Sequence, residues 1–119
     1  MDKEQAQRLA EEWYAAWNAH DLERILAHYS DEVVFTSPFA VEIAGHPYGR
    51  LEGKAALRDY FSAALERFPD LHFEPIALMV GLDSVVLHYR SVMDLPAAEL
   101  MVLGDDGLVA EVVAHYGDA

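Results

Sequence analysis

The segment from Glu11 to Pro38, EEWYAAWNAHDLERILAHYSDEVVFTSP, constrains the fold more than any other part of the sequence. Its apolar residues recur at helical spacing, resume that spacing after a short break, and then alternate as in a strand. Because the break is only a few residues long, the two expected helices must pack against each other. We expect the rest of the chain to close a pocket around four aromatic residues of this segment: Trp13, Trp17, Tyr29 and Phe35.

Capping and turn residues divide the chain into further elements. Asp21 is expected to cap the second helix, because its carboxylate can accept from amides of the first turn. Pro38 ends the first strand. Residues 39–52 contain Gly45, Pro47 and Gly49 without a sustained period, which predicts a long loop of the kind that often acts as a lid. The expected elements are helices over residues 3–18, 22–29 and 54–68, and strands over 33–37, 71–81, 84–93, 98–103 and 108–116.

This α-α-β-α-β-β-β-β order predicts one α+β domain over residues 1–119, in which a curved antiparallel sheet wraps around three helices as a cone. Short turns make successive strands antiparallel neighbours. The strand at 84–93 is apolar on both faces, and such a sheet needs a second cover. We therefore expect a homodimer through the outer sheet face that buries two or more of Leu87, Tyr89 and Met93.

Composition excludes several classes of function. The chain has 21 Asp and Glu residues against 8 Lys and Arg residues and a formal net charge of −13, so nucleic acid and anionic membranes are not expected partners. The absence of cysteine excludes a disulfide framework, a thiolate zinc site and a cysteine nucleophile. The histidines show no ligand spacing, so no metal site is expected. The N-terminal segment is polar and no run is long enough to span a membrane, so we expect a cytoplasmic protein.

Three motifs together with the element order resemble the nuclear transport factor 2-like superfamily. They are AAWNAHDLERILAHYSDEVVFTSP, LEGKAALRDYF and GLVAEVVAHYG, and the nearest branches are the SnoaL-like domains and ketosteroid isomerase. The resemblance implies a cystatin-like cone over essentially the whole chain. It is specific for fold and not for function, because the superfamily includes isomerases, hydrolases, cyclases, dehydratases and plain binding modules.

Aligning the chain with ketosteroid isomerase places three of that enzyme's functional positions. Its oxyanion-hole tyrosine falls on Trp13, its aspartate base on Ser37 and its protonated oxyanion-hole aspartate on Glu99. Only Glu99 keeps the chemical type. Because Ser37 cannot serve as a carboxylate base, the resemblance does not imply steroid double-bond isomerisation.

The orientation of His88 and Arg90 has two interpretations. Strand alternation sends both side chains outward, whereas the resemblance turns them into the cavity, and we expect the inward arrangement. Glu99 would then be an anion held by Arg90, and His88 would be the general base. If Arg90 points away, Glu99 becomes a neutral donor for an oxyanion. Glu99 could also reach solvent near its strand end. The candidate catalytic residues are Glu99, His88 and Arg90.

The expected pocket is aromatic and apolar. Trp13 and Tyr29 favour pocket lining because their polar tips need partners when buried, whereas Trp17 also fits ordinary core. The expected ligand is a hydrophobic or amphipathic small molecule. The leading hypothesis is a cofactor-independent acid–base enzyme (an isomerase, cyclase, lyase or hydrolase), and the alternative is a non-catalytic ligand-binding or dimerisation module. The expected lining residues are Trp13, Trp17, Tyr29, Phe35, Ser37, Tyr60, Phe61, Met101 and Val112.

Overall fold

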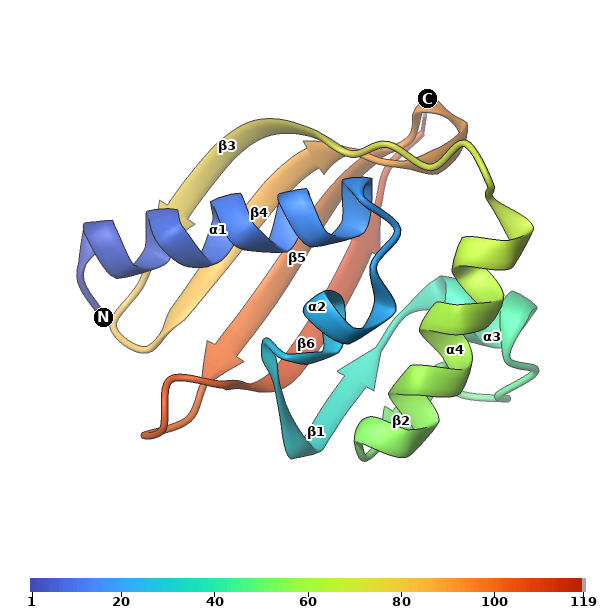
Figure 1. Cartoon of the computed structure of the whole chain (residues 1–119), viewed down its shortest axis with the longest axis horizontal. Helices are drawn as coiled ribbons and strands as arrows, with labels where there is room; N and C mark the ends of the chain where they lie inside the picture. Colours follow the sequence, from blue (N-terminus) through green and yellow to red (C-terminus); the bar gives the residue numbers. More distant parts are fainter. Residues whose placement is uncertain (119) are drawn as a thin grey trace.

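The N-terminal helix α1 (Lys3–Asn18) opens the computed structural model, which describes residues 1–118 (Figure 1). A capping box starts it: the Asp2 carboxylate accepts from the Gln5 amide, and the Gln5 side chain accepts from the Asp2 amide. The helix is amphipathic, and the residues on its buried face are Ala6, Ala10, Trp13, Tyr14, Ala16 and Trp17. No helix of the described residues is long and apolar enough to cross a membrane.

Helix α2 (Leu22–Leu26) begins as predicted, because the Asp21 carboxylate accepts from the Arg24 amide at 3.3 Å. It ends earlier than predicted. Strand β1 (Tyr29–Thr36) starts at Tyr29, which is paired with Val109 of the last strand. Sheet pairing therefore overrides the helical spacing that places Tyr29 on α2.

The segment predicted to be a structureless loop contains helix α3 (Pro38–Ile43) and strand β2 (Arg50–Glu52). The Ser37 hydroxyl caps α3 by accepting from the Phe39 amide at 3.2 Å. Pro38 occupies the first helical turn, where its missing N–H costs nothing. Strand β2 pairs antiparallel with β1 and forms one edge of the sheet.

The strands form one six-stranded sheet in the order β2-β1-β6-β5-β4-β3. Strand β1 pairs parallel with β6, so the sheet is mixed and not antiparallel throughout as predicted. The other neighbouring pairs are antiparallel. The remaining elements are α4 (Lys54–Arg67), β3 (Glu74–Val80), β4 (Ser84–Arg90), the 3-10 turn η1 (Val92–Asp94), β5 (Pro96–Leu103) and β6 (Val109–Tyr116).

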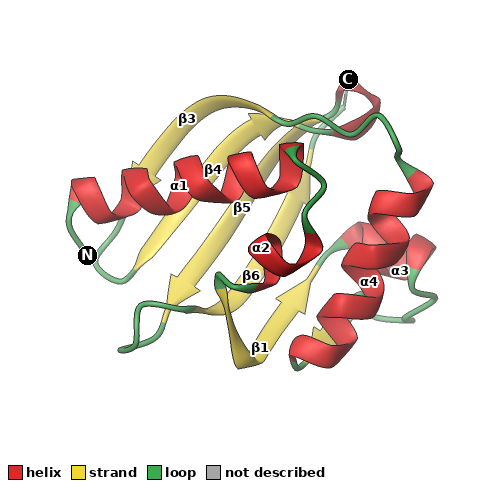
Figure 2. Ribbon diagram, in the orientation of Figure 1, coloured by secondary structure: helices red, strands yellow, loops and turns green. Residues whose placement is uncertain are grey.

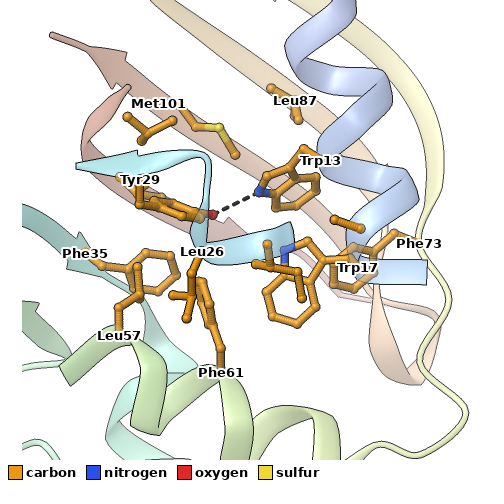
Figure 3. Packing of buried hydrophobic residues seen from close by; sticks show 14 of the residues in the cluster. Trp13, Trp17, Leu26, Tyr29, Phe35, Leu57, Phe61, Phe73, Leu87 and Met101 are labelled. Atoms are coloured by element: carbon orange, nitrogen blue, oxygen red, sulfur yellow. Dashed lines mark hydrogen bonds between the residues drawn. The ribbon is translucent and has the colours of Figure 1, made fainter. Parts of the chain in front are cut away.

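The helices α1, α2 and α4 lie over the same face of the curved sheet (Figures 1 and 2). Helix α3 packs against α4 and β6. The predicted α+β cone is confirmed, with four helices instead of three. Its core lies between the helices and the concave face, where aromatic residues of α1, β1 and α4 meet, including Trp13, Tyr29 and Phe61 (Figure 3).

Strand β4 shows which face of the sheet is inside. Leu87 and Tyr89 are both 0% exposed and belong to the core, so the expectation that they form an outer dimer surface is wrong. The outer face carries the alternate residues, and Val86, Leu100 and Val113 form one cross-strand row on it. Their side chains are only partly buried. Strand alternation alone favours this orientation, because the other face of β4 is the more polar one.

Candidate functional site

A narrow cavity lies inside the cone, bordered by α1, α3, α4 and the concave face of the sheet. The cavity volume open to the centres of water molecules is about 40 Å³. On the order of 10–15 Å³ of such volume holds one water, so the cavity as it stands has room for a few waters, and a ring that enters it must displace lining side chains. The residues that line it are Trp13, Trp17, Tyr29, Phe35, Phe39, Ile43, Tyr60, Phe61, Ala64, Phe68, Leu71, Phe73, Tyr89, Ser91, Val92, Glu99 and Tyr116.

Glu99 is the one carboxyl group among these lining residues of the described chain. It lies on β5 opposite Leu87 and Ala114, which places it on the concave face, and it is 4% exposed. Burial raises the Glu99 pKa to about 7, although the Tyr89 hydroxyl opposes this by donating to Oε1 at 2.5 Å. Desolvation therefore outweighs the hydrogen bond. A carboxyl group with this pKa can hold or release a proton near neutral pH.

The Glu99 charge influences five buried or partly buried tyrosines, of which Tyr89 donates to it. Burial first, and then the Glu99 charge, raise the pKa of Tyr14, Tyr29 and Tyr89. The same two causes raise the pKa of Tyr116. Burial raises the pKa of Tyr60 to about 12, opposed by the Ser37 hydroxyl and assisted by Glu99. These phenols are therefore neutral hydroxyl groups at physiological pH, available as hydrogen-bond donors around one carboxyl group.

The two tryptophans of α1 differ in hydrogen bonding. Trp13 Nε1 donates to the Tyr29 hydroxyl oxygen at 2.9 Å, and both residues are fully buried (Figure 3). Trp17 lies one helical turn further along and packs edge-on against Phe61, with ring centroids 4.8 Å apart. Its buried Nε1 has no hydrogen-bond partner among the described residues.

Most of the sequence-predicted lining residues lie around this cavity. Trp13, Trp17, Tyr29, Phe35, Tyr60 and Phe61 line it together with Glu99. Met101 and Val112 are fully buried in the core beside it and do not line it. Ser37 is 1% exposed and caps α3, so its hydroxyl has a structural partner.

His88 and Arg90 do not join Glu99, and the expectation that they face inward is wrong. His88 pairs across the sheet with Ala98, on the face opposite Leu87 and Glu99. Arg90 donates to the Asp94 carbonyl oxygen at 2.9 Å and pairs with the Asp94 carboxylate at 3.5 Å. The physical reason is the register of β4, in which Leu87 and Tyr89 take the inner positions. Strand alternation had favoured this outward arrangement.

Sequence reasoning missed several cavity residues. Tyr89 was assigned to the outer face, although it donates to Glu99. Tyr116 carries the signal that favoured Tyr29, an aromatic side chain whose polar tip needs a partner when buried. Phe39 and Ile43 belong to α3, which was predicted to be loop. Within residues 1–118, no group of three His, Asp or Glu side chains could hold a metal ion.

Comparisons with known proteins give a consistent family. Residues 10–116 match the SnoaL-like domain. A SnoaL-like protein of unknown function from Burkholderia thailandensis E264 is 46% identical, with a TM-score of 0.94 and coverage of 98% of both chains. A search of curated proteins found no match.

Two more distant structures share the fold. One, from Kribbella flavida DSM 17836, is described as a candidate ketosteroid isomerase; it is 19% identical with a TM-score of 0.76, covering 98% of this chain and 80% of that one. The other is SalBIII, an epoxide hydrolase/cyclase-like enzyme described in pyran ring formation in the polyether salinomycin. It is 19% identical with a TM-score of 0.76, covering 98% of this chain and 93% of that one.

Proposed function

Because this chain belongs to the SnoaL-like domain family, and because its cavity holds a buried carboxyl group that titrates near neutrality, we propose that it is a small-molecule enzyme that works by general acid–base chemistry. The observation that carries the proposal is the raised pKa of Glu99 together with its place in the cavity. A group with a pKa near the working pH is suited both to give and to take a proton.

The orientation of Arg90 supports the neutral-donor role for Glu99. With Arg90 paired to Asp94 outside the cavity, no cation among the described residues favours the charged form of Glu99. Protonated Glu99 would donate through Oε2 to an oxygen of the ligand and stabilise negative charge as it develops there. The ionised form would accept a proton from the ligand. Both roles need no cofactor and fit an isomerase, cyclase, lyase or hydrolase.

Steroid double-bond isomerisation is not the proposed reaction. Ser37 occupies the position of the carboxylate base of ketosteroid isomerase, and its hydroxyl accepts from the Phe39 amide. The more distant structures are under 25% identical and share only the fold, so neither the isomerase nor the epoxide chemistry is carried over to this chain.

The experiment compares Glu99→Gln with Glu111→Gln, because Glu111 is exposed on β6. Two neutral substrates report proton transfer: cyclohexanone, through deuterium uptake at its α-carbon, and styrene oxide, through ring opening. We expect the wild type to accelerate at least one of them. Glu99→Gln should lower that rate about 10²–10⁴-fold, and Glu111→Gln should leave it unchanged. A rate equal to the buffer rate, or equal losses in the two variants, would count against the proposal.

A non-catalytic binding module is the second candidate. It is favoured by the lining itself, because apart from Glu99 and the neutral phenols the described lining residues carry no ionisable side chain. Such a module would bind neutral rings in a Glu99-dependent way and leave both substrates unreacted.

We also propose a cytoplasmic homodimer that forms through the outer sheet face. The support is the apolar cross-strand row of Val86, Leu100 and Val113, which is only partly buried within one chain. The net charge of −13 makes nucleic acid and anionic membranes unsuitable partners.

A further inference from the structure

Two buried polar atoms that belong to cavity-lining residues have no hydrogen-bond partner among the described residues. They are Oε2 of Glu99 and Nε1 of Trp17. Buried polar atoms nearly always have a partner in the protein, in water or in a bound molecule. The two unpaired atoms therefore indicate what a ligand of this cavity must supply.

The Trp17 atom specifies the chemistry of one ligand group. An indole N–H can only donate, so its partner must be an acceptor such as a carbonyl or hydroxyl oxygen. Burial and the Glu99 charge raise the pKa of Tyr29, whereas the indoles of Trp13 and Trp17 oppose that rise. Trp13 Nε1 donates to the phenol oxygen at 2.9 Å, whereas Trp17 Nε1 makes no hydrogen bond of acceptable geometry among the described residues. The Trp17 donor remains available inside the cavity.

The Glu99 atom specifies a second ligand group and the net charge. Tyr89 occupies Oε1, which leaves Oε2 for an oxygen-bearing group of the ligand. No lysine, arginine or histidine is among the described residues that line the cavity. An anionic ligand would therefore be buried beside Glu99 without a compensating cation, at high cost. The aromatic lining favours a ring.

We propose that this cavity binds an uncharged, ring-containing molecule with two separate oxygen groups, one accepting from Trp17 Nε1 and one hydrogen-bonded to Glu99. This inference rests on the proposed function, because it defines the substrate class of the same cavity. It adds Trp17 as the residue that recognises the second oxygen.

The experiment measures calorimetric affinities for phenol and for the three dihydroxybenzenes at about pH 6, where these probes are neutral. Phenol carries one oxygen, and the isomers place a second oxygen at three different positions. In the wild type, at least one isomer should bind about tenfold more tightly than phenol, as expected for one added buried hydrogen bond. In Trp17→Phe the ratio of the dihydroxybenzene affinity to the phenol affinity should fall to about 1.

Tyr14→Phe is the matched control, because Tyr14 lies on the same helix, is buried and does not line the cavity. This variant should keep the gain. Each gain is a ratio within one protein, so a general loss of packing in either variant cancels. Adding a carboxylate to the ring, as in 3-hydroxybenzoate, should weaken binding at least tenfold relative to resorcinol.

Several outcomes would overturn the inference: no isomer exceeding phenol in the wild type, a gain that persists in Trp17→Phe, tight binding of 3-hydroxybenzoate, or no binding of any probe. Failure of the proposed function gives a different result. In that case Glu99→Gln leaves the catalytic rates unchanged while the Trp17-dependent affinity gain is still observed.

Discussion

Glu99 holds a proton near neutral pH because desolvation is the largest influence on it. The concave face of the sheet surrounds it with aromatic and aliphatic side chains, and the only hydrogen bond to it among the described residues comes from Tyr89. One donor offsets part of the cost of a buried charge and not all of it. The same burial that makes Glu99 a candidate acid therefore costs folding stability whenever the group is ionised.

This cost predicts the pH dependence of stability. The Glu99 pKa is raised from 4.5 to about 7, so the folded protein binds more protons than the unfolded chain between these values. Stability from this group is therefore lost as pH rises through that window, by on the order of 3 kcal/mol in total. Glutamine is neutral throughout and keeps an oxygen for Tyr89.

Denaturant titrations of wild type and Glu99→Gln at about pH 4.5 and pH 8 test this dependence. The stability of the variant relative to wild type should rise by about 3 kcal/mol between the two pH values. Any packing cost of glutamine is the same at both and cancels. A relative stability that stays constant between the two pH values would show that Glu99 titrates normally.

Glu99 could be singled out from the sequence, and strand alternation alone also oriented His88 and Arg90 correctly. A carboxylate between Ala97 and Met101 on an otherwise apolar strand face is visible in the pattern. Strand alternation puts leucine and tyrosine on one face of β4 and histidine and arginine on the other, and the pairing with β5 keeps this arrangement. The resemblance to ketosteroid isomerase favoured the opposite one.

At the scale of elements, a close backbone contact between Ser37 and Gly49 holds α3 against the cavity. The Ser37 amide donates to the Gly49 carbonyl oxygen at 2.9 Å. Gly49 has a φ of +65°, and a Cβ at that position would lie 2.6 Å from the Ser37 carbonyl oxygen. Glycine is therefore required here both for conformation and for space. The contact fixes the start of the helix that carries Phe39 and Ile43.

Gly49→Ala should destabilise the protein by about 2–5 kcal/mol, from left-handed strain and a backbone clash together. Gly45→Ala is the control, because Gly45 has a φ of +66° and nothing within 4 Å of its Cβ position. Its cost should be about 1–2 kcal/mol. Thermal and denaturant unfolding measure the loss of stability in both variants. Equal losses would show that the backbone adjusts to a Cβ beside Ser37 without added cost.

Helix α3 and strand β2, which lie where the sequence predicted a loop, were too short to show a period. Helix α3 has six residues and β2 has three, so neither presents enough positions for a helical or strand pattern. The Ser37-Pro38 pair is a helix start signal, which the resemblance to ketosteroid isomerase masks because it places Ser37 on a catalytic strand. The long helices α1 and α4 were predictable because their apolar faces extend over several turns.

At the scale of the whole molecule, the outer sheet face is the surface on which the proposed dimer depends. Leu100 lies at the centre of its apolar row, between Val86 and Val113. A lysine there would bring two like charges into a twofold interface without affecting the cavity on the other face.

Leu100→Lys should convert the protein from dimer to monomer at micromolar concentration, as measured by light scattering. Leu82→Lys is the control, because Leu82 is 92% exposed in the β3–β4 turn and lies off this row. It should remain dimeric. A monomeric wild type, or dissociation by Leu82→Lys alone, would contradict an interface centred on the outer face.

The chain order predicted the meander of β3 to β6 because short turns leave antiparallel pairing as the only choice. It did not predict that β1 lies beside β6. No turn links these strands, and their pairing depends on how α4 and the meander pack, which local patterns do not encode.

The parallel pairing of β1 with β6 also sets the order of events during synthesis. The ribosome makes β1 early and β6 last of all the strands. Until β6 emerges, the backbone groups along that side of β1 have no sheet partner, and Tyr29 lacks its neighbour Val109. A nascent chain that stops short of β6 therefore leaves an open sheet edge beside an aromatic cluster, which is the kind of surface that chaperones protect.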